Sequence, residues 1–342
     1  MTTAYLTDTR YDAHTLPGHP ECAERLQAIR ARIAEHGRDT QMKAFSPEPI
    51  SDAQILTVHT EDYLETVLKW GVTRGGIMLG SDTYLLPHSL ELARLSAGAA
   101  LRGVDAILSG EAHNGYAAAR PPGHHAVPDM AMGFCLLANI SLAARHAQAV
   151  YGLKRVLIVD YDVHHGNGTQ AIFYDDPSVL FLSTHQSPWY PGTGGINETG
   201  EGAGAGQTIN IPLPAGVGDQ GFRMIYEEIV WGAARRFQPE LILVSAGFDA
   251  HWRDPLGGLK LTVNGYAHLS RELIRMADEL CGGRILFVQE GGYNLEALSF
   301  CALAVVEALL GLPLGVDPLG AEAKNDPDIR PLLTRVKAVH GL

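Results

Sequence analysis

The sequence lacks the features of a nucleic-acid binder and of a disulfide-stabilised protein. Its 26 lysines and arginines are outnumbered by 38 aspartates and glutamates, which gives a formal charge of −12. Binding nucleic-acid phosphates needs a basic face, so this balance excludes a general nucleic-acid binder. Only four cysteines occur, and no two are spaced as a CxxC pair. They favour a reduced, cytoplasmic protein over a disulfide scaffold or a thiolate metal site.

Segments suited to export or to crossing a membrane are also missing. The N-terminal segment is polar where a signal peptide has an apolar stretch of about 7–15 residues. The most apolar segment, 295–316, is interrupted by Glu296, Glu307 and Pro313 and falls short of the roughly 20 apolar residues of a membrane helix. We therefore expect no membrane association, and a buried helix in this segment.

What the sequence does contain is an alternation of strand and helix patterns. Short, continuous runs of branched apolar residues are typical of strands covered on both faces, and such runs lie at 155–160, 179–183, 207–213, 241–245 and 284–288. Helical patterns lie at 21–36, 90–109, 136–151, 219–237, 264–281 and 295–310. This alternation predicts an α/β fold with a mostly parallel sheet. No repeat or low-complexity tract divides the chain, so we expect a single domain over 1–342.

The strongest chemical signal is the segment 159–168, which follows one of the predicted strands. Side chains two positions apart on an extended chain share a face, so Asp160, Asp162 and His164 should point the same way. A carboxylate and an imidazole side by side at a strand end form half of a zinc site. Taken alone, the same residues are equally consistent with a turn cap and a loop histidine.

Asp249, the pair His124 and His125, and Tyr293 are further candidates for the same site. Asp249 ends a second strand at the same sheet edge and would complete three protein ligands, although alone it is more typical of a turn. The adjacent histidines follow a rigid Pro-Pro-Gly turn, and imidazole exchanges a proton near neutral pH, but exposed loop histidines would have the same pattern. The phenol of Tyr293 can donate to a developing oxyanion unless the ring only packs.

Together these residues occur in motifs that resemble the zinc-dependent histone deacetylase superfamily. The motifs appear in order along nearly the whole chain: HPE at 19–21, RPPGHH at 120–125, GFC at 133–135, DYDVHHGNGT at 160–169, STH at 183–185, YPGTG at 190–194, AGFDAHWRDPLGG at 246–258 and EGGYN at 290–294. As a set they are far more specific than any one of them. The EGGY and DPLGG forms are similar to class II enzymes and their bacterial relatives, the deacetylase-like amidohydrolases and acetylpolyamine amidohydrolases.

The resemblance implies a fold and a set of catalytic roles. The fold is the arginase-deacetylase fold, with a central parallel sheet of about eight strands flanked by helices. Asp162, His164 and Asp249 match the ligands of one zinc ion per chain. The remaining matches are His125 as general base, His124 as its electrostatic partner, Tyr293 as the phenol that polarises the amide carbonyl, and Asp160 as the carboxylate behind His124.

One position departs from the class I pattern. Asn167 stands where class I members have a second Asp, as it commonly does in class II-like members. An amide can orient His125 but supplies no full charge, so the pKa of His125 should be raised less than with a carboxylate. Which histidine acts as the general acid stays open.

The resemblance also implies potassium ions and an aromatic substrate pocket. One potassium site matches Asp160, Asp162, His164, Ser183 and Thr184, and a second would lie near Phe173, Asp176 and Val179. The pocket matches are Gly133, Phe134, Tyr190 and Leu256, with the two rings enclosing an alkyl linker and Leu256 at the rim. Without the resemblance, the two aromatic residues would be read as ordinary core or surface residues.

We therefore expect a zinc-dependent amidohydrolase that removes acetyl or other acyl groups from acyl-lysine side chains or related small amines and releases acetate. An acetylpolyamine amidohydrolase is the alternative. Leu256 disfavours this alternative slightly, because polyamine-selective relatives place a carboxylate near the mouth of the pocket, where it can bind a distant ammonium. Asp82 or Glu91 would restore such a charge, and the net charge of −12 suits cationic substrates.

Two more remote functions fit the sequence less well. An arginase-like ureohydrolase is disfavoured, because that family has a further metal-binding Asp where this chain has Gly166. A non-catalytic acyl-lysine binding module is disfavoured because every catalytic position is filled. The sequence leaves the natural substrate open, and it leaves open whether the chain forms a homo-oligomer.

Overall fold

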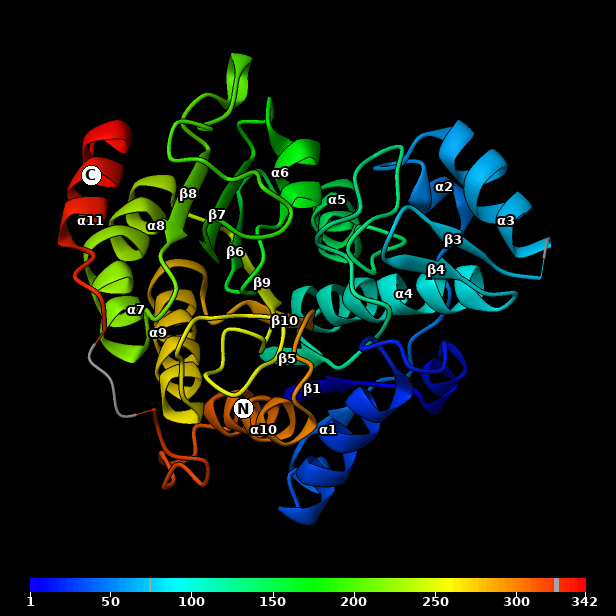
Figure 1. Cartoon of the computed structure of the whole chain (residues 1–342), viewed down its shortest axis with the longest axis horizontal. Coiled ribbons are helices and arrows are strands. Elements are labelled where there is room, and N and C mark those ends of the chain that lie inside the picture. Colours follow the sequence, from blue (N-terminus) through cyan, green and yellow to red (C-terminus); the bar gives the residue numbers. More distant parts are fainter. Residues whose placement is uncertain (74, 323–325) are drawn as a thin grey trace.

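A central parallel sheet organises the computed structural model, which describes residues 1–73, 75–322 and 326–342 (Figure 1). Within these residues eight strands form one sheet in the order β2-β1-β5-β10-β9-β6-β7-β8. The strands are β1 Thr3–Leu6, β2 Lys43–Ala44, β5 Asn114–Ala117, β6 Val156–Asp160, β7 Val179–Gln186, β8 Thr208–Leu213, β9 Leu241–Ala246 and β10 Ile285–Gln289. All neighbouring pairs run parallel. The α/β fold expected from the sequence is therefore confirmed.

The five strands expected from apolar runs are all present and lie side by side. Every residue of β6, β7, β9 and β10 is buried, which explains why their sequences show no alternation of apolar and polar residues. The sequence did not reveal β1, β2 and β5. These strands are short, and β5 contains Asn114 and Gly115, which have little intrinsic preference for strands.

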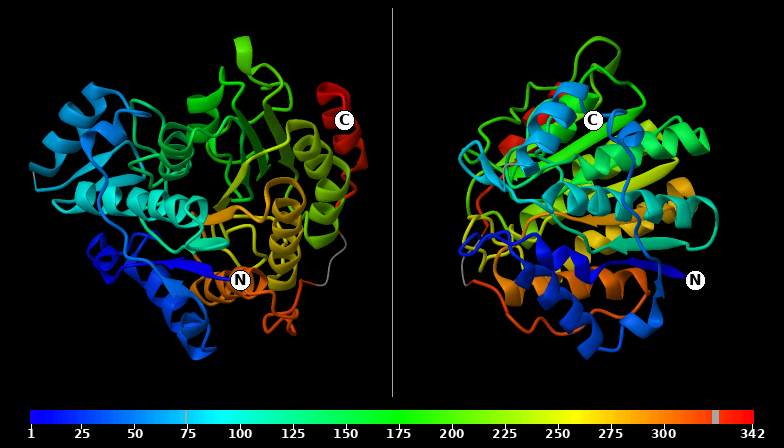
Figure 2. Two further views of the ribbon diagram at one scale, coloured as in Figure 1. Left: turned by 180° about the vertical axis from the view of Figure 1, so that it is seen from behind. Right: turned by 90° about the vertical axis from the view of Figure 1, so that its right-hand side faces the viewer.

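Helices cover both faces of the sheet (Figure 2). The helices are α1 Ala23–Glu35, α2 Asp52–Ile55, α3 Trp70–Thr73, α4 Ser89–Leu108, α5 Asn139–Tyr151, α6 Asn167–Phe173, α7 Asp219–Ile225, α8 Trp231–Phe237, α9 Val263–Cys281, α10 Leu295–Leu309 and α11 Arg330–His340. Helices α4 and α5 pack together on one face, and α1, α10 and α9 form a second packed group on the other. None of the helices in the described part of the chain is both long and apolar enough to cross a membrane.

Local sequence signals account for several helix ends. Asn294 accepts a hydrogen bond from the backbone N–H of Ala297 and caps α10, and Thr262 caps α9 in the same way. The helix expected at 136–151 begins only at Asn139, because the chain still bends at 136–137. The helix expected over 219–237 is α7 and α8 joined by a π-helical turn at Tyr226–Val230.

The carboxyl end of the sheet carries the candidate residues. Strands β6, β9 and β10 are neighbours in the sheet, and the loops that follow them contain the two aspartate motifs and the EGGY motif. A short antiparallel hairpin, β3 Ile77–Leu79 and β4 Thr83–Leu85, was not anticipated from the sequence. It contributes Asp82 to the same region. Loops at this edge are where α/β folds bind ligands.

Candidate active site

Asp162, His164 and Asp249 form a compact cluster of metal-ligand type. Each offers one ligand atom, and these atoms lie within 4.8 Å of one another. The first two follow β6 and the third follows the adjacent β9, so parallel pairing of these strands brings them together. Nδ1 of His164 lies 3.0 Å from Oδ1 of Asp162 and 3.4 Å from Oδ2 of Asp249.

The hydrogen bonding of Asp249 fits a metal ligand. Its Oδ1 accepts the N–H of Val163 at 2.8 Å, whereas the buried Oδ2 has no hydrogen-bond donor among the described residues. Leaving a buried carboxylate oxygen without a partner is costly unless a cation meets it. Two carboxylates and one imidazole are a donor set that zinc accepts, with room for a fourth ligand.

Glycines let the backbone approach these carboxylates closely. A Cβ on Gly291 would lie 2.0 Å from Oδ2 of Asp249, and a Cβ on Gly247 would lie 2.0 Å from Oδ2 of Asp162. Instead, the N–H of Gly291 donates to Oδ2 of Asp162 at 2.9 Å. Glycine is required at these positions of the AGFD and EGGY motifs, because a side chain there would collide with the carboxylates of the cluster.

His124 is paired with Asp160 beneath the cluster. Its Nδ1 lies 3.0 Å from Oδ2 of Asp160, and its Nε2 lies 3.9 Å from Oδ2 of Asp162. Burial alone would lower the pKa of His124, but the negative charges of Asp160 and Asp162 outweigh it and raise the pKa to about 10. The geometry thus favours a positively charged His124.

The surroundings of His125 favour a neutral imidazole, in contrast to those of His124. Its Nδ1 lies 2.7 Å from Oδ1 of Asn167, and its ring packs 4.0 Å from that of His124. Burial, followed by the positive charges of His124 and His164, keeps the pKa of His125 well below its usual range. Because an amide oxygen only accepts, it fixes the proton on Nδ1 and leaves the Nε2 lone pair of a neutral imidazole available.

Tyr293 follows β10 in the EGGY turn and is fixed from several sides. Its backbone N–H donates to Oδ2 of Asp254 at 2.7 Å, and its ring meets that of Phe134 edge-on at 5.7 Å. The guanidinium of Arg25 lies 4.8 Å from the ring centre. Burial raises the pKa of Tyr293 well above its usual value, so the phenol keeps its proton and can donate it in a hydrogen bond.

A cavity of about 280 Å³ opens onto these groups. The four pocket residues expected from the sequence all line it: Gly133, Phe134, Tyr190 and Leu256. His125, His164 and Tyr293 line it as well. Phe134 has a left-handed backbone, with φ of 68°, and its N–H donates to Oγ1 of Thr83 at 2.9 Å. Three further lining residues are Asp82, Trp189 and Pro255, of which the sequence analysis had singled out only Asp82.

The residues matched to potassium sites lie in two places. Ser183 and Thr184 are in β7 next to the end of β6, where Ser183 pairs with Asp160 in the sheet. Oγ1 of Thr184 donates to the main-chain oxygen of Asp160 at 3.3 Å. The second set, Phe173, Asp176 and Val179, lies between α6 and β7, where Asp176 pairs with Arg145 at 2.5 Å.

Two buried carboxylates that support the site were missed. Oε2 of Glu290 accepts the N–H groups of Gly123 at 2.7 Å and His124 at 3.2 Å, which ties the histidine loop to β10. Asp254 accepts the N–H groups of Leu256, Tyr293 and Asn294, so it joins the pocket rim to the phenol. Their presence in the EGGY and DPLGG motifs was the available signal, but nothing in sequence spacing indicates which backbone groups they hold.

The chain is similar to known proteins over most of its length. Residues 19–309 match the histone deacetylase domain. The chain belongs to the histone deacetylase family. Histone deacetylase 14, chloroplastic, of Arabidopsis thaliana is 41% identical over 355 residues, covering 96% of this chain and 82% of that protein. The histone deacetylase-like amidohydrolase of Pseudomonas aeruginosa is 42% identical over 304 residues, covering 88% and 80%.

A solved structure agrees over nearly the full length. The crystal structure of the HDA15 HD domain matches with a TM-score of 0.91 and 37% identity, covering 99% of this chain and 96% of that one. The family resemblance and the fold expected from the sequence are thus confirmed. As a member of the histone deacetylase family, the chain is placed among deacetylases and related amidohydrolases.

Proposed function

We propose that this histone deacetylase family member is a zinc-dependent amidohydrolase that removes acetyl or other acyl groups from acyl-lysine side chains or related amines. One observation carries the proposal. One cavity of about 280 Å³ is lined by a neutral His125, a protonated Tyr293 and His164, and His164 belongs to a carboxylate–imidazole cluster suited to zinc. Amide hydrolysis needs these three kinds of group around one carbonyl.

Asp162, His164 and Asp249 would hold the metal. One zinc ion there would supply a Lewis acid for the amide oxygen and make a water molecule more acidic. Oδ2 of Asp249 supports this assignment, because it is a buried anionic oxygen that accepts no hydrogen bond among the described residues and lies 3.4 Å from Nδ1 of His164, another proposed ligand. Asp160, Ser183 and Thr184, with main-chain groups near Asp162 and His164, are proposed to bind a potassium ion, and Phe173, Asp176 and Val179 a second one.

The two histidines would divide the work of proton transfer. Neutral His125, oriented by Asn167, takes a proton from the attacking water through Nε2. His124, kept positive by Asp160, stabilises the negative charge that develops beside it. The phenol of Tyr293 donates a hydrogen bond to the carbonyl oxygen as it becomes negative. A protonated histidine then returns a proton to the leaving amine.

The cavity supports a substrate with an alkyl linker. Phe134 and Tyr190 line it with aromatic rings, and Leu256 lines it without a charge. These walls suit the methylenes of an acyl-lysine side chain. Asp82 also lines the cavity and is only partly buried, which supports acetylpolyamine as a second candidate substrate because a carboxylate can attract a distant ammonium.

A comparison of rates tests the proposal. Zinc-loaded protein is assayed with an acetyl-lysine peptide, a longer acyl-lysine peptide, acetylputrescine and acetylspermidine, with metal content measured and the His125→Ala variant as the blank. We expect hydrolysis that depends on zinc, fastest with acyl-lysine. Binding without hydrolysis of any of them would instead identify a binding module, and two tightly bound manganese ions would favour a ureohydrolase.

A further inference from the structure

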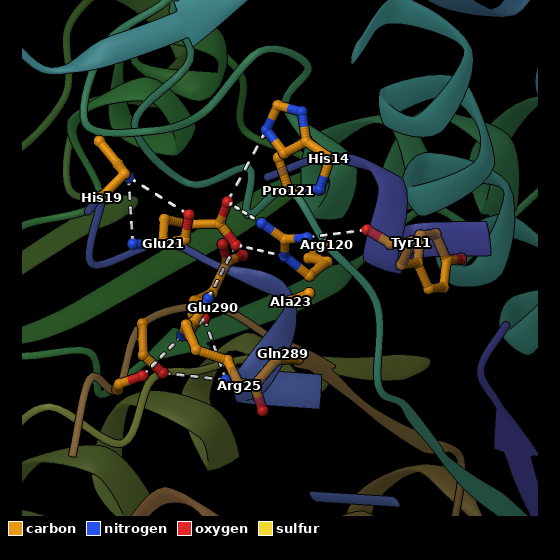
Figure 3. Close-up of polar contacts among 12 residues, drawn as sticks. Tyr11, His14, His19, Glu21, Ala23, Arg25, Arg120, Pro121, Gln289 and Glu290 are labelled. Atoms are coloured by element: carbon orange, nitrogen blue, oxygen red, sulfur yellow. Dashed lines mark hydrogen bonds and ion pairs between the residues drawn. The ribbon is translucent and has the colours of Figure 1, made fainter. Parts of the chain in front are cut away.

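A fully buried carboxylate, Glu21, lies outside the cavity and joins two arginines (Figure 3). Its Oε1 accepts Nε of Arg120 at 2.6 Å, and its Oε2 accepts Nη2 of the same guanidinium at 2.6 Å. Nη1 of Arg25, one helical turn away on α1, donates to Oε1 at 3.2 Å. The hydroxyl of Tyr84 completes the shell, 3.2 Å from Oε2.

Arg25 connects this carboxylate to the turn that bears the phenol. Its Nη2 donates to the main-chain oxygen of Glu290 at 2.5 Å, and its Nε donates to that of Gly292 at 2.7 Å. These two carbonyls flank Gly291, and that of Gly292 immediately precedes Tyr293. The same guanidinium faces the ring of Tyr293, at 4.8 Å from its centre. The position of Arg25 therefore sets both the backbone and the ring of Tyr293.

Arg120 connects the carboxylate to the histidine loop. It is the first residue of the RPPGHH motif, directly after β5 and its flanking alanines, and its Nη1 also donates to the main-chain oxygen of Tyr11 at 2.8 Å. Four and five residues later the loop presents His124 and His125. The two prolines between Arg120 and the histidines restrict the backbone, so the placement of Arg120 limits where the two imidazoles can lie.

Charge makes the carboxylate essential to this arrangement. Burial alone would raise the pKa of Glu21, but the charge and hydrogen bonds of Arg120 outweigh it and lower the pKa to about 2. His14, whose Nε2 lies 3.7 Å from Oε2 of Glu21, has its pKa lowered to about 3, mainly by burial, and is neutral. Without the negative charge of Glu21, the two buried guanidinium groups would lose the carboxylate that both of them bind, and their like charges would be left uncompensated at this point.

We propose that Glu21 is a positioning residue that sets the placement of Tyr293 relative to the His124–His125 pair by holding Arg25 and Arg120 together. The proposal rests on the proposed function, because its effect is exerted on the chemical step. Glu21 does not line the cavity, so it acts through the two arginines and not on substrate. None of the three proposed ligand residues contacts Glu21 in the described hydrogen bonds, so we expect metal binding to be retained without it.

Steady-state kinetics of Glu21→Gln tests this role, with Glu24→Gln as the matched control, because Glu24 is an exposed glutamate three residues further on, in the first turn of α1. We expect kcat to fall about 10–100-fold while KM changes less than about twofold and zinc stays at about one per chain. The control should keep the parent rate. Glu21→Asp, which keeps the charge, should restore part of kcat.

A double-variant comparison separates positioning from a general structural effect. If Glu21 acts through the phenol, Glu21→Gln should cost at least about tenfold less in kcat in a Tyr293→Phe background than in the parent. An equal loss in both backgrounds, a loss of zinc, or a kcat equal to that of the control would each overturn the proposal.

If Glu21→Gln does not fold, Arg120→Lys is the alternative variant, because it keeps the charge but loses the paired hydrogen bonds. An unchanged kcat in Arg120→Lys would overturn the proposal. A parent protein inactive on every acyl amide would overturn the proposed function, whereas an active parent with an unaffected Glu21→Gln overturns this proposal alone.

Discussion

The amide oxygen of Asn167 lies 2.7 Å from Nδ1 of His125 and fixes the tautomer of that imidazole. A carboxylate at this position would favour the protonated ring, because it adds a negative charge to the hydrogen bond. We therefore expect Asn167→Asp to raise the pKa of His125. A base works only when unprotonated, so the acidic limb of the kcat/KM profile should move to higher pH. A pH–rate profile measures this, and an acidic limb that stays in place would contradict the assignment of His125 as the base.

Removing either reacting side chain should abolish turnover without removing the metal. His125→Ala deletes the base, and Tyr293→Phe deletes a single hydroxyl that donates to the oxyanion. We expect each to lower kcat by at least about a hundredfold, with zinc remaining at about one per chain. Kinetics on acetyl-lysine peptide, combined with metal analysis, measures both quantities. Near-parent activity in both variants would refute the roles given to these residues.

Asp249→Ala should act differently, by releasing the metal. It removes one of three ligands and leaves too few donors for tight binding. We expect purified protein with much less than one zinc per chain, and a thermal midpoint that no longer rises when zinc is added. The exposed Asp129→Ala variant serves as the control and should keep its zinc. Full zinc content in Asp249→Ala would place the metal elsewhere.

The sequence predicted the parts of the site that depend on local spacing. Asp160, Asp162 and His164 alternate along the end of a strand, and the rule that parallel strands end at one edge brought Asp249 beside them. The structure has this arrangement because β6 and β9 are direct neighbours. The central strands could also be predicted, because strands covered on both faces consist of continuous apolar runs.

Contacts made by the tertiary fold could not be predicted in this way. Strand β5 is a strand because it pairs with β1 and β10, and its own sequence does not indicate one. Its Gly115 packs closely against β1, where an added Cβ would lie 3.1 Å from Cβ of Ala4. Asp254 and Glu290 act by accepting backbone N–H groups from segments far away in sequence. Glu21 pairs with Arg120, which lies 99 positions along the chain, and no periodicity encodes such a pairing.

Substrate choice should respond to charge at the pocket mouth. Leu256 lines the cavity without a charge, so Leu256→Glu would add a carboxylate where the distal ammonium of an acetylpolyamine could be met. We expect the ratio of kcat/KM for acetylspermidine over acetyl-lysine peptide to rise about tenfold, which corresponds to about 1.4 kcal/mol. Leu256→Gln, similar in size but neutral, is the control and should leave the ratio close to that of the parent.

Removing the charge of Asp82 should lower the ratio of kcat/KM for acetylspermidine over acetyl-lysine peptide, the opposite of the change expected for Leu256→Glu. It already supplies a carboxylate to the cavity, so Asp82→Asn should lower kcat/KM for acetylspermidine more than for acetyl-lysine peptide if this charge meets the ammonium. Oδ1 of Asp82 also accepts the N–H of Gly133 at 3.3 Å, and a loss of that contact alone would slow both substrates alike. Salt distinguishes the two effects, because screening weakens the attraction of exposed charges. We expect the parent's preference between the substrates to shift with ionic strength and that of Asp82→Asn to shift less. Equal salt dependence in both proteins would show that Asp82 acts on the backbone of the pocket and not on the substrate.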